Sequence, residues 1–151
     1  NINNIIEASI DMLNMQINAK DINITTDFQI EKPEVSIDPE RFNQVIYNLL
    51  VNAIKYTPKK GHIKIKTEGV LENNIESVKI TIKDSGKGIP PDDLPYIFER
   101  FYRVDKSRDR KTGGLGLGLA IVRKIIELHG GTIKAESIIN EGSTFYIAIP
   151  Y

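Results

Sequence analysis

A helix following Asp38 is the element that the hydrophobic pattern predicts most clearly. Its apolar residues recur at spacings of three and four, as expected for an amphipathic helix that buries one stripe. These residues are Phe42, Val45, Ile46, Leu49, Leu50 and Ala53. Asp38 precedes Pro39, so a capping side chain followed by a proline in the first helical position marks the start. The pattern therefore predicts one long helix that ends near Thr57.

The remaining periodicity predicts two more helices and a set of strands. Helices are expected over residues 2–20 and over 117–129, where Gly130 and Gly131 would end the second one. Strands are expected over residues 22–28, 35–37, 62–68, 78–84, 132–137 and 144–149. Alternation in the third and fourth of these runs predicts an antiparallel hairpin with one face in water. The order of elements predicts an α+β two-layer sandwich with a mixed, mostly antiparallel sheet and helices on one face.

The stretch from Ile89 to Gly113 lacks a sustained pattern. Three prolines stand near its start, six basic residues follow, and only residues 94–101 look locally helical. A long, weakly patterned connection inside a compact domain is usually a lid over a functional site, or disordered. We expect residues 89–113 to form a lid.

Composition narrows the function classes. A chain of 151 residues fits a single domain over residues 1–151. Twenty basic and twenty acidic side chains balance, so charge gives no sign of a nucleic-acid partner or of contact with an acidic membrane. Cysteine is absent, which excludes disulfides and thiolate metal sites, and no apolar run is long enough for a membrane span. Because the chain begins with Asn1, we expect it to be a fragment of a longer protein.

Three polar residues beside the apolar stripe, Asn48, Asn52 and Lys55, are spaced to lie along one line of the central helix. An asparagine at a helix edge most often satisfies a neighbouring loop. Here a lysine stands one turn further on and two glycine-rich loops follow, which favours a ligand site. The side-chain oxygen of Asn52 suits Mg²⁺, which is otherwise held by water and substrate phosphates.

Asp84 is placed by strand alternation on the core face, where a carboxylate is costly unless a donor reaches it. It could cap its own turn by accepting from Gly86. It could instead accept a hydrogen bond from a ligand amino group, with Gly86 and Gly88 letting the backbone pass close to that ligand.

The run from Gly114 to Gly118 opens a predicted helix, and free amides at a helix N-terminus bind phosphate. The alternative is a flexible turn. The run is neither a P-loop nor G-x-G-x-x-G, because Leu119 stands where the third glycine would be. Tyr56 could stack on a base or simply pack, and Arg103 is the lid residue that we expect to face a terminal phosphate.

These motifs, in this order, resemble the catalytic and ATP-binding domain of bacterial sensor histidine kinases, in the GHKL ATPase superfamily. The N box corresponds to residues 48–56, the G1 box to 84–88, the F box to 98–101 and the G2 box to 114–118, and the run 142–145 also matches. The resemblance implies the Bergerat fold, with ATP bound between sheet and helices under a lid at residues 89–113.

The resemblance also implies a role for each matching residue. Asn52 would bind Mg²⁺, Lys55 would reach phosphate and Arg103 would contact the γ-phosphate. Tyr56 would lie against adenine, and Asp84 would accept from its amino group. The nucleotide-binding set further includes Gly86, Gly88, Ile89, Gly114, Gly116, Leu117, Gly118 and Thr144.

Asn48 separates classes within the superfamily. ATPases of the gyrase B and MutL types, and relatives that phosphorylate serine, carry a glutamate at this position to activate the nucleophile. Asparagine is a poor general base, which fits a kinase whose acceptor histidine is already a nucleophile. We therefore count Asn48, Lys55 and Arg103 as catalytic.

The phosphoacceptor is not in this chain. We expect His62 to be a strand residue near water and His129 to be a cation at a helix C-terminus, and neither is followed by the acidic residue that family acceptors have. The resemblance implies that residues 1–20 continue from a missing dimerisation domain. That domain would carry the histidine, form the homodimer of the full-length kinase and contact the response regulator. The chain would be a cytoplasmic part of a membrane-anchored sensor. A nucleotide-binding module without phosphotransfer and a stand-alone ATPase are the alternatives.

Overall fold

The architecture is known from a computed structural model that describes residues 1–31, 33–72, 74–104 and 115–151. The helices are α1 (Ile2–Met12), α2 (Asn14–Ala19), α3 (Pro39–Tyr56) and α4 (Gly118–Leu128), with a short 3-10 helix, η1 (Leu94–Tyr96). The strands are β1 (Asn23–Phe28), β2 (His62–Glu72), β3 (Ile75–Asp84), β4 (Thr132–Ile138) and β5 (Gly142–Pro150). Residues 105–113 of the predicted lid lie outside the described residues, as does Gly114.

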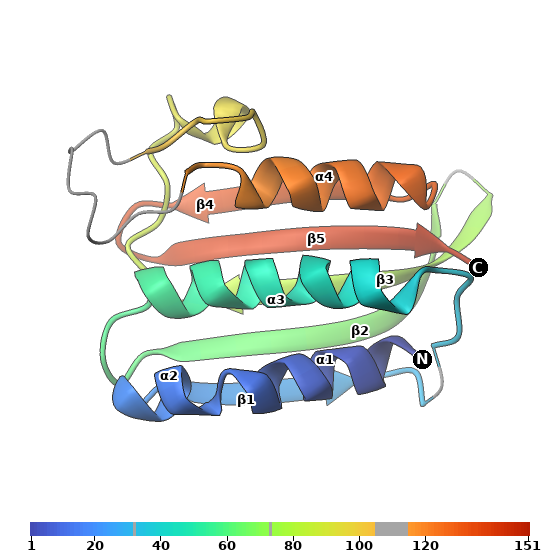
Figure 1. The fold of residues 1–151 in the computed structure, drawn as a ribbon, viewed down its shortest axis with the longest axis horizontal. Coiled ribbons are helices and arrows are strands. Elements are labelled where there is room, and N and C mark those ends of the chain that lie inside the picture. Colours follow the sequence, from blue (N-terminus) through green and yellow to red (C-terminus); the bar gives the residue numbers. More distant parts are fainter. Residues whose placement is uncertain (32, 73, 105–114) are drawn as a thin grey trace.

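The strands form one mixed sheet in the order β1-β2-β3-β5-β4. The edge strand β1 runs parallel to β2, and every other neighbouring pair is antiparallel. The helices α1, α3 and α4 cover one face of this sheet (Figure 1). The predicted α+β two-layer sandwich is confirmed, and the β2–β3 hairpin is longer than the alternation indicated.

The helix α3 lies at the centre of the helical layer, between α1 and α4 (Figure 1). The whole predicted stripe of α3 is buried in the core. Burying an aliphatic or aromatic side chain of this size contributes about 1.5–3 kcal/mol, so the stripe fixes which face of α3 meets the sheet. Asp38 caps the helix as predicted, because its Oδ1 accepts from the amides of Glu40 at 2.9 Å and Arg41 at 3.1 Å.

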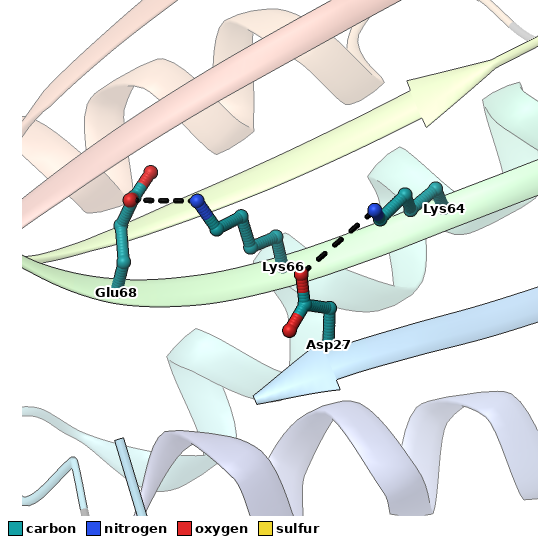
Figure 2. A network of polar contacts seen from close by, with 4 residues as sticks. All are labelled: Asp27, Lys64, Lys66 and Glu68. Atoms are coloured by element: carbon teal, nitrogen blue, oxygen red, sulfur yellow. Dashed lines mark hydrogen bonds and ion pairs between the residues drawn. The ribbon is translucent and has the colours of Figure 1, made fainter. Parts of the chain in front are cut away.

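The opposite face of the sheet is polar. Ile63, Ile65 and Thr67 of β2 are buried, whereas the alternating residues point away from the helices. Figure 2 shows two ion pairs on this outer face. Lys66 Nζ lies 2.7 Å from Glu68 Oε2, and Lys64 Nζ lies 3.8 Å from Asp27 Oδ2. Ion pairs at a solvent-exposed surface contribute at most about 1 kcal/mol each to the free energy of unfolding, so these two add little to the stability of the fold.

The single helix predicted over residues 2–20 is wrong in one respect, because the helix is interrupted at Leu13. The Leu13 amide donates to Ile10 O at 3.0 Å, a bond that spans three residues and tightens the turn. The interruption leaves Leu13 and Ile17 both buried in the core. The Ile17 amide still donates to Leu13 O at 3.0 Å, so these two side chains lie on the same face.

One other predicted element is absent and another is shorter than predicted. Residues 35–37 form no strand, although Val35 and Ile37 pack against the core. Their alternation reflects burial of an extended connection without a hydrogen-bonded neighbour. Residues 94–101 form only η1 followed by turns, in a segment where Pro95 has no amide to donate.

His129 follows the last turn of α4, as expected, and its ring contacts two backbone groups. The amide of Asp38 donates to His129 Nε2 at 3.0 Å. His129 Nδ1 lies 2.7 Å from Ile125 O. The ring thereby links the start of α3 to the end of α4. His62 is exposed at the start of β2, as expected.

Candidate nucleotide-binding site

A cavity of about 650 Å³ lies at one end of the helical layer. It is bounded by the last turns of α3, the end of β3, the start of β5, residues 97–104 and the start of α4. The predicted site residues that line it are Asn52, Lys55, Tyr56, Asp84, Gly88, Ile89, Arg103, Gly116, Leu117 and Gly118. Motifs more than 60 residues apart in the sequence thus meet around one space.

The end of α3 supplies one wall. Ala53 is buried in the core, and Asn52, Lys55 and Tyr56, which share one face of the helix at i, i+3 and i+4, line the cavity. Asn48, one turn earlier, is half-buried and does not line the cavity. The catalytic role of Asn48 that the resemblance implies therefore stays a prediction.

Asp84 lines the cavity and is only 5% exposed. Its Oδ1 accepts from the amides of Gly86 at 2.8 Å and Ser143 at 3.3 Å. Within the described part of the chain, no donor reaches Oδ2. Burial raises the pKa of the Asp84 carboxyl above its ordinary value, and the two amide bonds lower it in part. Asp84 both caps its turn and keeps one oxygen available to a ligand.

Ser143 and Phe145 of β5 line the cavity, and sequence reasoning missed both. Thr144, which it chose instead, does not line the cavity, because alternate residues of a strand point to opposite faces of the sheet. Ile147 and Ile149 are buried, so counting back by two along β5 would have identified Phe145 and Ser143.

Gly86 and Gly88 have structural reasons to be glycine. A Cβ on Gly86 would lie 2.8 Å from the Tyr56 carbonyl oxygen, and one on Gly88 would lie 2.2 Å from that of Ile138. Gly88 also has a φ of +74°, in the region that favours glycine. Gly86 does not line the cavity, whereas Gly88 and Ile89 do. These glycines bring protein backbones together beside Asp84.

The segment around Arg103 is fastened to the loop before α4. The Phe101 amide donates to Gly116 O at 3.0 Å. A Cβ on Gly116 would lie 2.7 Å from the Tyr102 carbonyl oxygen, and its φ is +75°. The Tyr102 hydroxyl in turn donates to Asp93, and this bond raises the pKa of Tyr102 to about 12. These contacts place Arg103 on the same rim as the start of α4.

The N-terminus of α4 faces the cavity. Leu117 precedes the helix and provides no side-chain cap, and a Cβ on Gly118 would meet no atom within 4 Å. The first amides of a helix lack partners within the helix and carry the positive end of its dipole. Leu117 and Gly118 line the cavity, so this end of the space can accept an anion.

Positively charged side chains outnumber negatively charged ones among the described residues that line the cavity. Lys55, Lys87 and Arg103 are cationic, and Asp84 is the one carboxylate among the described lining residues. The ammonium groups of Lys55 and Lys87 each lie 5.1 Å from the centroid of the Tyr56 ring, a cation–π distance. An electropositive space with a single buried acceptor suits a polyanion that also carries a donor group.

Among the described residues, no group of three or more histidine, cysteine, aspartate or glutamate side chains could hold a metal. The amide of Asn52 lines the cavity and bonds to no other described residue. One free side-chain oxygen fits Mg²⁺ that takes its other ligands from water and phosphate.

The family model described as histidine kinase-, DNA gyrase B- and HSP90-like ATPase matches residues 37–151. The chain belongs to this ATPase family. The matched residues include every element that borders the cavity, and membership of the family implies ATP as its nucleotide. Among the described residues, no helix is long and apolar enough to cross a membrane.

Two curated relatives are sensor kinases. The chain is 44% identical to the sensor histidine kinase WalK of Bacillus subtilis over 117 residues, which are 78% of the chain and 19% of WalK. It is 48% identical to the signal transduction histidine-protein kinase ArlS of Staphylococcus aureus over 127 residues, which are 84% of the chain and 27% of ArlS. The chain thus spans about a quarter or less of either relative.

Solved structures share the fold over nearly the whole chain. The catalytic domain of histidine kinase ThkA superposes with a TM-score of 0.83 at 34% identity, covering 99% of this chain and 94% of that one. ThkA in complex with the response regulator TrrA gives a TM-score of 0.79 at 32% identity, covering 99% and 40%. Full-length ShkA in complex with AMPPNP gives 0.84 at 25%, covering 99% and 30%. The ATPase-family domain seen here is therefore the kind found in histidine kinases.

Proposed function

We propose that this chain is the catalytic and ATP-binding domain of a sensor histidine kinase. It binds Mg-ATP and donates the γ-phosphoryl group to a histidine on a separate dimerisation domain of the same polypeptide. The observation that carries the proposal is the combination of groups that line the cavity. Asp84 offers a buried acceptor oxygen to a ligand, and Lys55, Arg103 and the N-terminus of α4 border the same space.

Different groups that line the cavity suit different parts of ATP. Asp84 Oδ2 would accept from the adenine amino group, with Tyr56 beside the base. Lys55, Arg103 and the first amides of α4 would neutralise the phosphates, and Asn52 would hold Mg²⁺. When bound, the metal would supply further neutralisation of phosphate charge. Catalysis by this chain is then positioning and charge stabilisation, which is the main requirement of phosphoryl transfer.

The acceptor site and the signalling partners belong to the rest of the polypeptide. The relatives WalK and ArlS are several times longer than this chain, which leaves room for a dimerisation domain, a membrane anchor and a sensor. ThkA forms a complex with a response regulator, and we extend that kind of partner to this protein through the dimerisation domain. The full-length kinase would be a homodimer.

The metal assignment can be tested by calorimetry. Asn52→Ala should weaken Mg-ATP binding about 10- to 100-fold, by analogy with other disturbed metal sites. Asn18→Ala, an exposed asparagine on α2, is the matched control. Unchanged affinity of Asn52→Ala in the presence of magnesium would refute the assignment.

Phosphotransfer can be tested by mixing this chain and [γ-³²P]ATP with the dimerisation domain encoded upstream in the same gene. Label should appear on that domain, and Asn52→Ala should prevent it. Tight ATP binding without any transfer would favour the nucleotide-binding module instead.

A further inference from the structure

Lys20, which follows α2, contacts the last turn of α3. Its Nζ donates to three backbone carbonyl oxygens, those of Ile54 at 2.7 Å, Lys55 at 2.9 Å and Thr57 at 2.7 Å. A lysine ammonium has three donors, and each one is used here. A side chain from the N-terminal part of the chain is thus bound at the end of the helix that carries the N box.

The end of α3 needs such a partner. The last four carbonyls of a helix lack intrahelical donors and carry the negative end of its dipole. Many helices satisfy them with a glycine in the left-handed conformation. Here the capping residue Thr57 is extended, with φ −76° and ψ 130°, and Pro58 follows with no amide to donate. Lys20 supplies donors and positive charge that the local sequence does not.

The backbone of Lys20 is itself held in place. Its carbonyl oxygen accepts from the Lys60 amide at 2.8 Å, and the Asn23 amide donates to Gly61 O at 2.9 Å. The turn after α3 is therefore bonded to the segment between α2 and β1. The backbone of Lys20 is held by the turn after α3, and its ammonium binds the last carbonyls of α3. The side chain can therefore restrain the end of this helix.

The restrained turn is the one that bears Lys55 and Tyr56, both of which line the cavity. Lys20 does not line it, so it would act through these two residues. We propose that Lys20 is a positioning residue for the nucleotide site, holding the end of α3 so that Lys55 faces the phosphates and Tyr56 the base. The identity of the ligand rests on the function proposed above.

The first test needs no nucleotide. In Lys20→Met, which removes the charge and keeps much of the side-chain length, amide exchange at Lys55, Tyr56 and Thr57 should speed up at least about tenfold by NMR, since three charge-assisted bonds are lost. Unchanged exchange in this turn would overturn the proposal. Lys20→Gln, which keeps an amide donor, is the milder second variant and should change exchange in the same direction by less.

The second test is calorimetry with Mg-ATP. Lys20→Met should weaken binding about tenfold, and Lys20→Arg, which keeps a cation with several donors, should recover most of the loss. Faster exchange with unchanged affinity would overturn the positioning role and leave Lys20 as a cap that only stabilises α3. If the wild-type chain does not bind Mg-ATP at all, the proposed function fails, and the exchange measurement alone decides whether Lys20 holds the turn.

Two controls separate positioning from general effects. Lys59→Met removes an exposed lysine close to the same turn, one with no bond to another described residue, and controls for net charge. Ser9→Ala breaks the bond of 2.9 Å from Ser9 Oγ to Asn43 Oδ1, which joins α1 to the other half of α3, and controls for stability. Both should retain wild-type affinity. A loss in Ser9→Ala as large as that in Lys20→Met would show that any weakening of α3 impairs binding, which contradicts a specific role.

Discussion

Asp84→Asn should separate the two tasks of this side chain. The amide oxygen of asparagine can replace Oδ1 in accepting from the amides of Gly86 and Ser143. Those two donors then fix the orientation of the group, so its NH₂ takes the place of Oδ2 and faces the cavity. The variant keeps the turn and presents a donor where the wild type presents an acceptor.

The expected loss follows from one bond. A hydrogen bond to a charged group contributes about 1.5–3 kcal/mol, which corresponds to roughly a 10- to 150-fold weaker affinity for ATP. Guanine has a carbonyl oxygen where adenine has its amino group. The wild-type carboxylate should therefore disfavour GTP by at least about tenfold, and the asparagine should narrow that difference.

Stability should change in the opposite direction. Burial raises the pKa of Asp84 in the folded chain above the unfolded value of 3.8, so ionising it opposes folding. The contribution of Asp84 to stability is fully present below pH 3.8 and is lost as the pH rises through the raised folded value. At pH 7 the wild type carries this cost and the asparagine does not. Without nucleotide, Asp84→Asn should be at least as stable at pH 7, and any gain should vanish in acid.

Calorimetry with ATP and GTP, and thermal unfolding at neutral and acid pH, measure both effects. Asp92→Asn, an exposed carboxylate close in sequence, controls for the lost charge and should behave as the wild type. Wild-type affinity and selectivity in Asp84→Asn would mean that Asp84 only caps its turn and that the base is recognised elsewhere.

Two further outcomes are expected. The isolated chain should release phosphate from ATP slowly, because Asn48 cannot act as a general base; rapid turnover that Asn52→Ala abolishes would place the chain among the dedicated ATPases. Gly88→Ala should lower the free energy of unfolding by about 1–3 kcal/mol, because φ is +74° and the new Cβ would meet the Ile138 carbonyl. Gly118→Ala, whose Cβ would meet nothing within 4 Å, is the control in thermal unfolding, and equal losses in the two variants would contradict this explanation.

Sequence periodicity was sufficient for the elements that bury a regular face. The stripe on α3 and the alternation in β2 and β3 predicted which side chains lie in the core, including Asp84. Periodicity failed to predict the secondary structure where apolar residues are buried at regular spacing but the backbone hydrogen bonds are interrupted or absent. Val35 and Ile37 alternate like a strand but have no sheet neighbour, and the apolar pattern continues through the interruption at Leu13.

Residues of the candidate site could be predicted where they belong to a sequence motif. They could not be predicted where only a contact between distant parts of the chain brings them to the site. Thr144 belongs to the matching run 142–145, although the alternation of β5 puts Ser143 on the cavity side. No local pattern could have linked Lys20 to the end of α3, because the contact joins residues 34 to 37 apart in the sequence. The contact of His129 with the Asp38 amide likewise joins residues 91 apart.

The position of β5 in the sheet has a consequence for the order of folding. It is the last strand along the chain, yet it lies between β3 and β4 and pairs with both. Residue 77 is paired with residue 150, so the sheet depends on contacts between distant parts of the sequence, which form slowly. During synthesis, β4 has no sheet neighbour until Gly142–Pro150 has left the ribosome. Losing these nine residues would therefore leave β4 without a partner and reduce the sheet to β1-β2-β3.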